Sequence, residues 1–119
     1  YISVQLGSTS EEWADKLLSE GYSFQKLALS SYVEALEALL DGRAVACITD
    51  SAFLKPYLKK HPDIAVRVKV LSQLGGVEAY GYATRPGDAW LREKINNALR
   101  GLMSSPAWNS LLEKWGLEG

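Results

Sequence analysis

Along this chain, short apolar runs alternate with segments in which apolar residues recur every three or four positions. The runs predict strands and the spaced patterns predict amphipathic helices, because the two structures bring side chains to one face with different periods. Strands are expected at residues 2–6, 24–29, 44–49, 64–71 and 77–84. Helices are expected at residues 11–18, 31–41, 51–58, 88–102 and 105–115. This alternation favours an α/β fold with right-handed crossovers.

One expected strand indicates how the sheet is built. Residues 44–49 read AVACIT, an unbroken run of small apolar side chains that is typical of a strand buried on both faces of a parallel sheet. We therefore predict an α/β fold with a doubly wound, mostly parallel sheet and helices on both faces. The residues do not determine the strand order, and we take an order near 2-1-3-5-4 by analogy with common doubly wound sheets. In this order the first and third strands are neighbours. Ligands of such sheets bind outside the C-terminal strand ends, where the strand order reverses.

Polar residues follow both of these strands. Gly7, Ser8, Thr9 and Ser10 come after the first strand, and Asp50 comes after the third. Hydroxyl groups and the free N–H groups at the start of the following helix suit a carboxylate or a phosphate. If the two strands are neighbours, Asp50 lies about 5 Å away. A zwitterion fits this pair, with its carboxylate on the helix start and its ammonium on Asp50, whereas Asp50 would repel a phosphate.

The same polar residues have a second interpretation that needs no ligand. Ser8 or Thr9, followed by Glu11 or Glu12, fits a capping box worth about 1 kcal/mol. Asp50 likewise fits an ordinary helix N-cap. The sequence leaves both interpretations open, and the ligand-binding one depends on the strand order.

Composition and charge narrow the classes of function. The 119 residues suggest one domain or a piece of a larger one, and their formal net charge of -1, with scattered cations, argues against a nucleic-acid or anionic-membrane surface. Cys47 and His61 are single, so we expect no disulfide, no metal and no cofactor. No run is long enough to span a bilayer. The chain opens on YISVQL without a signal peptide, so we expect a mature or excised form, or a cytosolic protein.

Four segments carry a resemblance to a known family. They read GSTSEEWADKLL, SSYVEALEALLDGRAVACITDSAFLKPYLKK, AYGYATRPGDAWLREKINNALRGL and LLEKWG. In this order and at about this spacing, they resemble the extracytoplasmic amino-acid-binding proteins of ABC transporters. Those proteins have the type II periplasmic binding fold, which the ligand-binding core of ionotropic glutamate receptors shares. The resemblance covers nearly the whole chain.

The resemblance implies roles for the candidate residues. In this family two α/β lobes close over an amino acid. The segment that matches Gly7 to Thr9 meets the ligand carboxylate with N–H and hydroxyl groups, and the carboxylate that matches Asp50 takes the ligand ammonium. A side-chain pocket would draw on Ser30, Ser31 and Gln73, together with the other lobe.

The chain departs from the family pattern because it starts where the second lobe would start. Residues 1–87 match the ligand-binding second lobe, and residues 88–119 match C-terminal helices that usually pack on the first lobe. The first lobe is missing, together with the arginine that usually clamps the ligand carboxylate. We expect a fragment, an engineered lobe or a half that needs a partner, either the missing lobe or a second copy in a homodimer.

Three hypotheses about function follow. The favoured one is a binding protein for an L-amino acid in the periplasm or outside the cell, which works with an ABC transporter permease. An enzyme related by fold, such as a prephenate or arogenate dehydratase or a lytic transglycosylase, is disfavoured because no acid–base pair with its own pocket is visible. The third hypothesis is a structural or dimerising domain that has lost ligand binding.

Overall fold

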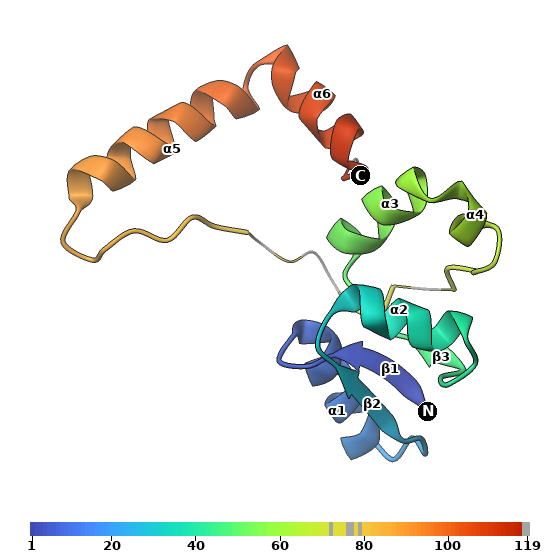
Figure 1. Cartoon of the computed structure of the whole chain (residues 1–119). Helices are drawn as coiled ribbons and strands as arrows, with labels where there is room; N and C mark the ends of the chain where they lie inside the picture. Colours follow the sequence, from blue (N-terminus) through green and yellow to red (C-terminus); the bar gives the residue numbers. More distant parts are fainter. Residues whose placement is uncertain (72, 76–77, 79, 118–119) are drawn as a thin grey trace. The chain divides into compact units, whose positions relative to one another are not determined.

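A computed structural model describes residues 1–71, 73–75, 78 and 80–117 of the chain. The chain divides into two compact units, Tyr1–Leu74 and Gly75–Gly119 (Figure 1). The first unit holds a sheet with its helices, and the second holds two helices. The division expected from the sequence is one of function, into a ligand-binding lobe at residues 1–87 and C-terminal helices at 88–119. That functional division stays a prediction.

The first unit is built on a parallel sheet in the order β2-β1-β3. Its strands are β1 (Ile2–Gln5), β2 (Lys26–Leu29) and β3 (Ala46–Cys47). Ile2, in the central strand, is paired with Lys26 on one side and with Ala46 on the other. The expected α/β class is confirmed, and so is the expectation that the first and third strands are neighbours.

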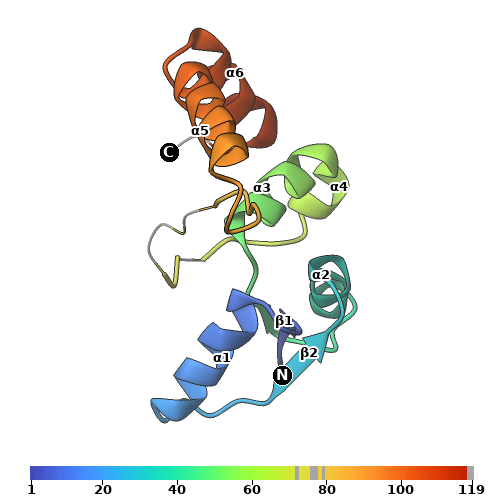
Figure 2. The ribbon, with the colours of Figure 1, turned by 90° about the vertical axis from the view of Figure 1, so that its left-hand side faces the viewer.

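Two helices cover opposite faces of this sheet, α1 (Thr9–Ser19) and α2 (Tyr32–Leu40) (Figure 2). The fully buried apolar residues are small and lie in β1, α1 and α2: Val4, Ala14, Ala35 and Ala38. Ser3 is also buried, and its hydroxyl donates a hydrogen bond of 2.7 Å to the carbonyl of Ala35. The core of the unit is therefore centred on β1.

Two further helices follow β3 where the sequence predicted one helix and a strand. They are α3 (Ser51–Lys60) and α4 (Pro62–Ala65). The strand expected at residues 64–71 is wrong, because residues 64 and 65 belong to α4 and residues 66–71 form no strand. Pro62 is the first residue of α4, where its fixed φ angle favours the start of a helix. The alternating pattern after it has no neighbouring strand to pair with among the described residues.

β3 is shorter and more exposed than AVACIT predicted. Ala44 is buried, but Val45 is 83% exposed, so burial of this run on both faces is wrong. The reason is that β3 forms an edge of the sheet within the described ranges.

In the strand expected at 77–84, Val77 and Ala79 lie outside the described residues, and residues 78 and 80–84 form no strand. The predicted order is thus found only for its first three strands.

The second unit contains the two helices that were expected near the C-terminus, α5 (Ala89–Met103) and α6 (Pro106–Trp115), which pack on each other. Asp88 caps α5 by accepting a hydrogen bond from the Leu91 N–H at 3.1 Å. Gly116 ends α6 in the left-handed conformation, which glycine adopts without strain. Neither helix contains a buried residue. No helix in the described parts of the chain is long and apolar enough to cross a membrane.

Val4→Ala tests the core of the first unit. Val4 is fully buried, so losing two methyl groups and leaving a cavity should lower the free energy of unfolding by about 2 kcal/mol. Val45→Ala is the matched control, because Val45 is exposed and its truncation should change the free energy by less than about 0.5 kcal/mol. Urea unfolding of both variants measures the difference, and equal losses would contradict this core.

Candidate functional site

Most of the polar residues singled out in the sequence lie at one edge of the sheet. Because β1, β2 and β3 run parallel, their C-terminal ends share this edge, and α1, α2 and α3 begin there (Figure 1). The pairing of β1 with β3 reaches Ser3 opposite Cys47, and the N–H of Ile48 donates to the carbonyl of Ser3 at 3.0 Å. The segment after β1 and Asp50 after β3 therefore leave the sheet side by side.

The segment Gly7 to Ser10, here called the strand-end loop, is held by its own side chains. Gly7 has φ +73°, a conformation that other residues rarely adopt. Ser8 is the N-cap of α1, since its hydroxyl oxygen accepts from the Ser10 N–H at 3.2 Å and its hydroxyl donates to the Gln5 carbonyl at 2.7 Å. Ser10 is buried and accepts from the Gln5 N–H at 3.1 Å. Both serines are thus engaged in shaping the loop.

Thr9, unlike Ser8 and Ser10, is not engaged in shaping the loop. It is exposed, and within the described residues its N–H and hydroxyl form no hydrogen bond. The N–H groups at the start of a helix carry a positive partial charge. Thr9 therefore offers the donors that an anion at this edge would use.

A carboxylate of the protein itself already contacts the loop. Glu11 accepts a hydrogen bond from the Gly7 N–H at 3.1 Å and forms an ion pair of 3.0 Å with Lys26, which also pairs with Asp15 at 2.8 Å. The Gly7 amide first, and then Lys26, hold the pKa of the Glu11 carboxyl below its ordinary value. The sequence showed Glu11 only as a capping residue, and nothing in its pattern indicated Lys26, which comes from β2.

Asp50 occupies the position that the sequence predicted, at the start of α3. Its carboxylate accepts from the Ala52 N–H at 2.7 Å, so the helix-cap interpretation is correct as geometry. The residue is half-buried. Next to it, the hydroxyl oxygen of Thr49 is buried and has no hydrogen-bond partner within the described ranges, which is an unfavourable state for a polar atom.

The three residues expected in a side-chain pocket are not all brought together. Ser31 is the N-cap of α2 and accepts from the Glu34 N–H at 3.1 Å. Ser30 donates both its N–H and its hydroxyl to the Glu34 carboxylate, so Glu34 also binds the residue before the cap. Gln73 is exposed, outside any helix or strand. Ser30 and Ser31 therefore lie at the candidate edge, whereas no described contact connects Gln73 with it.

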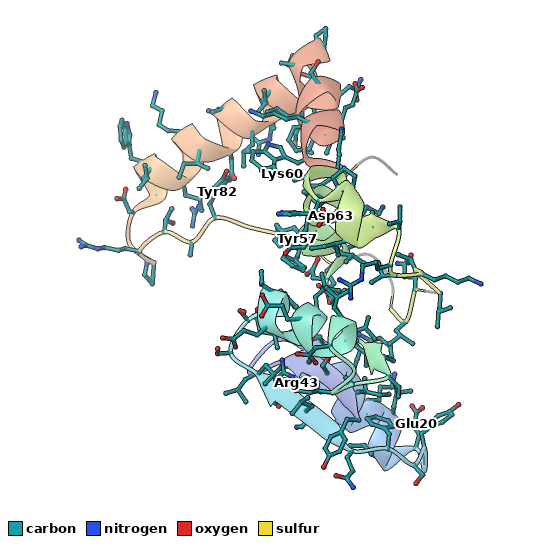
Figure 3. The ribbon with its side chains drawn as sticks, turned by 45° about the vertical axis from the view of Figure 1, so that its right-hand side comes forward. Glu20, Arg43, Tyr57, Lys60, Asp63 and Tyr82 are labelled. Carbon is teal, nitrogen blue, oxygen red and sulfur yellow. The ribbon has the colours of Figure 1, made fainter. Side chains whose placement is uncertain are left out.

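Other features of the first unit add nothing to this edge. A shallow hollow lined by Glu20, Gly21 and Tyr22 lies at the far end of α1 (Glu20 is labelled in Figure 3). Cys47 is a half-buried residue of β3, and burial raises the pKa of its thiol. No three histidine, cysteine or carboxylate side chains gather as a metal site in the described part of the chain.

The pKa of Glu11 provides a test of the loop. Its pKa is lowered in the folded state, so its stabilising contribution is present above the ordinary carboxyl pKa and is lost as the pH falls through the lowered value. A carboxyl-detected NMR titration should place Glu11 below ordinary glutamates. Lys26→Met should raise the pKa only in part, because the Gly7 amide is the larger cause. A Glu11 that titrates at or above the ordinary value would contradict the contact.

The chain is similar to known binding proteins over nearly its whole length. The chain is 27% identical over 114 residues to the amino-acid-binding protein AabA of Dichelobacter nodosus, with 96% of this chain and 44% of the relative covered. It is 26% identical over 116 residues to ABC transporter arginine-binding protein 1 of Escherichia coli, with 96% and 46% covered. The chain thus spans about half the length of these relatives.

Solved structures give a consistent result. An ancestral arginine-binding protein bound to glutamine matches with a TM-score of 0.77 and 34% identity, over 98% of this chain and 50% of that one. A structure of an ancestral arginine-binding protein bound to arginine matches with a TM-score of 0.78 and 34% identity. This match covers 96% of this chain and 49% of that one. This similarity confirms that the fold is that of one lobe of a type II periplasmic binding protein.

A family model described as "ABC transporter, phosphonate, periplasmic substrate-binding protein" matches residues 9–119. This match extends from the strand-end loop through both C-terminal helices. The matched family and the named relatives are binding proteins rather than enzymes. The chain belongs to this family of periplasmic substrate-binding proteins of ABC transporters.

Proposed function

We propose that the chain binds a small zwitterionic solute, an L-amino acid, as part of an extracytoplasmic substrate-binding protein for ABC-type transport. The observation that carries this proposal is the parallel pairing of β1 with β3. It supports a site in which the strand-end loop and Asp50 leave the sheet at the same edge. Neighbouring strands are about 4.8 Å apart, which suits a ligand whose two charged groups share one carbon atom.

Each half of the proposed site has its own chemical support. The loop offers the N–H and hydroxyl of Thr9, and its Gly7 N–H already donates a hydrogen bond to the Glu11 carboxylate. A ligand carboxylate would use the same positive end of α1. Asp50 is an anion at the start of the next helix, and we assign it to the ligand ammonium. Ser30 and Ser31, at the start of α2, are assigned to the ligand side chain, and Gln73 is kept as a more distant candidate.

The relatives support an amino acid as the ligand. Their names include an amino-acid-binding protein and an arginine-binding protein, and a matching structure is titled as bound to glutamine. Because this chain spans about half of their length, we propose that it forms half of the site. A half-site should bind weakly, with a Kd of about 1 mM, or about -4 kcal/mol.

The second unit supports a partner for this half. Large apolar side chains of α5 and α6 are exposed: Trp90, Leu91, Met103, Leu111 and Trp115. We propose that a complementary lobe, or a second copy of this chain, covers residues 88–119. We place the complete assembly in the periplasm or outside the cell, next to a transporter permease.

A phosphonate is the second candidate ligand, because the matching family model is described by that substrate. The start of α1 would suit a phosphonate as well as a carboxylate. Asp50 argues against it, since a carboxylate repels a phosphonate dianion. The two candidates therefore predict opposite effects of the charge on Asp50.

Asp50→Asn separates the two ligands and also separates ligand binding from helix capping. Asparagine caps helices as well as aspartate does, so the free energy of unfolding should change by less than about 0.5 kcal/mol. Amide NMR titrations with L-arginine and L-glutamine should then show binding weakened by roughly tenfold, since a hydrogen-bonded charge pair is lost. Binding of methylphosphonate should become tighter if a phosphonate is the natural ligand.

Asp50→Ala is the control, because it removes the cap together with the charge. It should cost about 1 kcal/mol of stability and weaken amino-acid binding as much as Asp50→Asn does. Shifts of the wild-type amides should cluster at Gly7, Thr9 and Asp50. A wild-type chain whose amides do not shift with any of these ligands would leave the structural or dimerising domain as the better description.

A further inference from the structure

An aromatic column runs from the start of α2 along one side of α3. The rings of Tyr32 and Phe53 are stacked at 5.4 Å between centroids, and those of Phe53 and Tyr57 lie 5.1 Å apart. His61 stacks on Tyr57 at 4.2 Å, and its Nδ1 lies 2.9 Å from the Tyr57 carbonyl oxygen. Phe53, Tyr57 and His61 follow one another at intervals of four residues, so they lie on one side of α3 and its C-cap. Figure 3 labels Tyr57 on the side of α3 toward α2.

The near end of this column is connected to the strand-end loop. The side-chain oxygen of Gln5 accepts from the Tyr32 N–H at 2.9 Å, which fixes the start of α2 against the end of β1. The carbonyl of Gln5 accepts from the Ser8 hydroxyl at 2.7 Å. Gln5 thus contacts the loop with its backbone and Tyr32 with its side chain.

The other side of the column is connected to Asp50. The N–H of Phe53 donates to the Asp50 carbonyl at 3.1 Å, and the N–H of Leu54 donates to the same oxygen at 2.9 Å. A continuous series of contacts therefore joins the loop to Asp50, from Ser8 through Gln5, Tyr32 and Phe53.

The aromatic stack is a side-chain contact between α3 and the rest of the unit. No residue of α3 is buried, and its main packing partner is the short helix α4. Pro56 lies inside α3 and lacks the N–H that would bond to the preceding turn. β3, which leads into it, is two residues long. The stack of Tyr32 on Phe53 is a direct contact between α3 and α2, which packs on the sheet.

We propose that Gln5, Tyr32 and Phe53 are positioning residues, which set the distance between the strand-end loop and Asp50 and so select ligands that carry an ammonium group next to a carboxylate. This inference rests on the proposed amino-acid site. Gln5, Tyr32 and Phe53 need not touch the ligand. They act by holding Asp50 where the ammonium lies once the carboxylate is on the loop.

The test compares L-glutamine with its analogue that lacks the α-amino group. Both place a carboxylate on the loop, but only glutamine uses Asp50. Phe53→Leu removes the ring stack and keeps an apolar side chain, so it should weaken glutamine binding by roughly two- to tenfold, the size of an aromatic-pair contribution. Binding of the analogue should stay unchanged in amide NMR titrations. Phe53→Tyr keeps the ring and should restore the wild-type ratio of the two affinities.

Tyr57→Leu is the matched control, since it removes a ring of the same column one turn farther from Asp50. It should lower stability in urea to a similar degree and leave the ratio of affinities unchanged. Tyr32→Leu removes the other ring of the stack and should repeat the result of Phe53→Leu, which keeps the test valid if one variant does not fold.

The outcomes separate the two proposals. Suppose that the wild-type chain binds both compounds and that Phe53→Leu leaves the ratio of the two affinities unchanged. This result would overturn the positioning role and leave the amino-acid site intact. A wild-type chain that binds neither compound would overturn the amino-acid site, and the positioning role with it.

Discussion

β1 is hydrogen-bonded on both of its sides, to β2 and to β3, and the arrangement of the candidate site depends on these pairings. Parallel pairing brings the C-terminal ends of the strands to one edge, so the starts of α1, α2 and α3 meet there. The buried Ser3, Val4 and small alanines keep α1 and α2 close to the central strand. If β1 paired differently, the strand-end loop and Asp50 would be separated by at least one further strand spacing.

Helix capping and the proposed ligand binding would use the same groups at this edge. Ser8, Ser31 and Asp50 each cap a helix, so each has a structural role without any ligand. The capping side chains nevertheless differ in charge. A neutral serine cap satisfies backbone N–H groups and little more, whereas Asp50 adds a negative charge that its capping function does not need, because asparagine or serine caps equally well. Under the proposed function, this negative charge would pair with the ligand ammonium.

The second unit carries apolar surface that its own packing leaves exposed. α5 and α6 form close to the expected residues, yet neither contains a buried residue. Their exposed tryptophans and leucines are the kind of apolar surface that folded proteins cover with another element or another chain. An exposed apolar residue also precedes β3, where Val45 is exposed although the run AVACIT is typical of an interior strand. Both observations agree with a chain that spans about half the length of its relatives.

The sequence by itself determined the features that depend on neighbouring residues. Helix starts at Ser31 and Asp50 were predicted correctly, because a side chain and a backbone N–H two or three residues away decide a cap. The α/β class and the position of Asp50 after the third strand followed from periodicity. Whether the candidate residues bind a ligand stays a prediction.

Tertiary structure decided what depends on residues far apart in the chain. The alternating residues 66–71 form no strand, because a strand needs a partner that the pattern cannot supply. Lys26 reaches Glu11 from the neighbouring strand, and Phe53 stacks on Tyr32 from another helix. No local pattern encodes such contacts, since they arise only when the packing of the sheet and helices brings distant segments together.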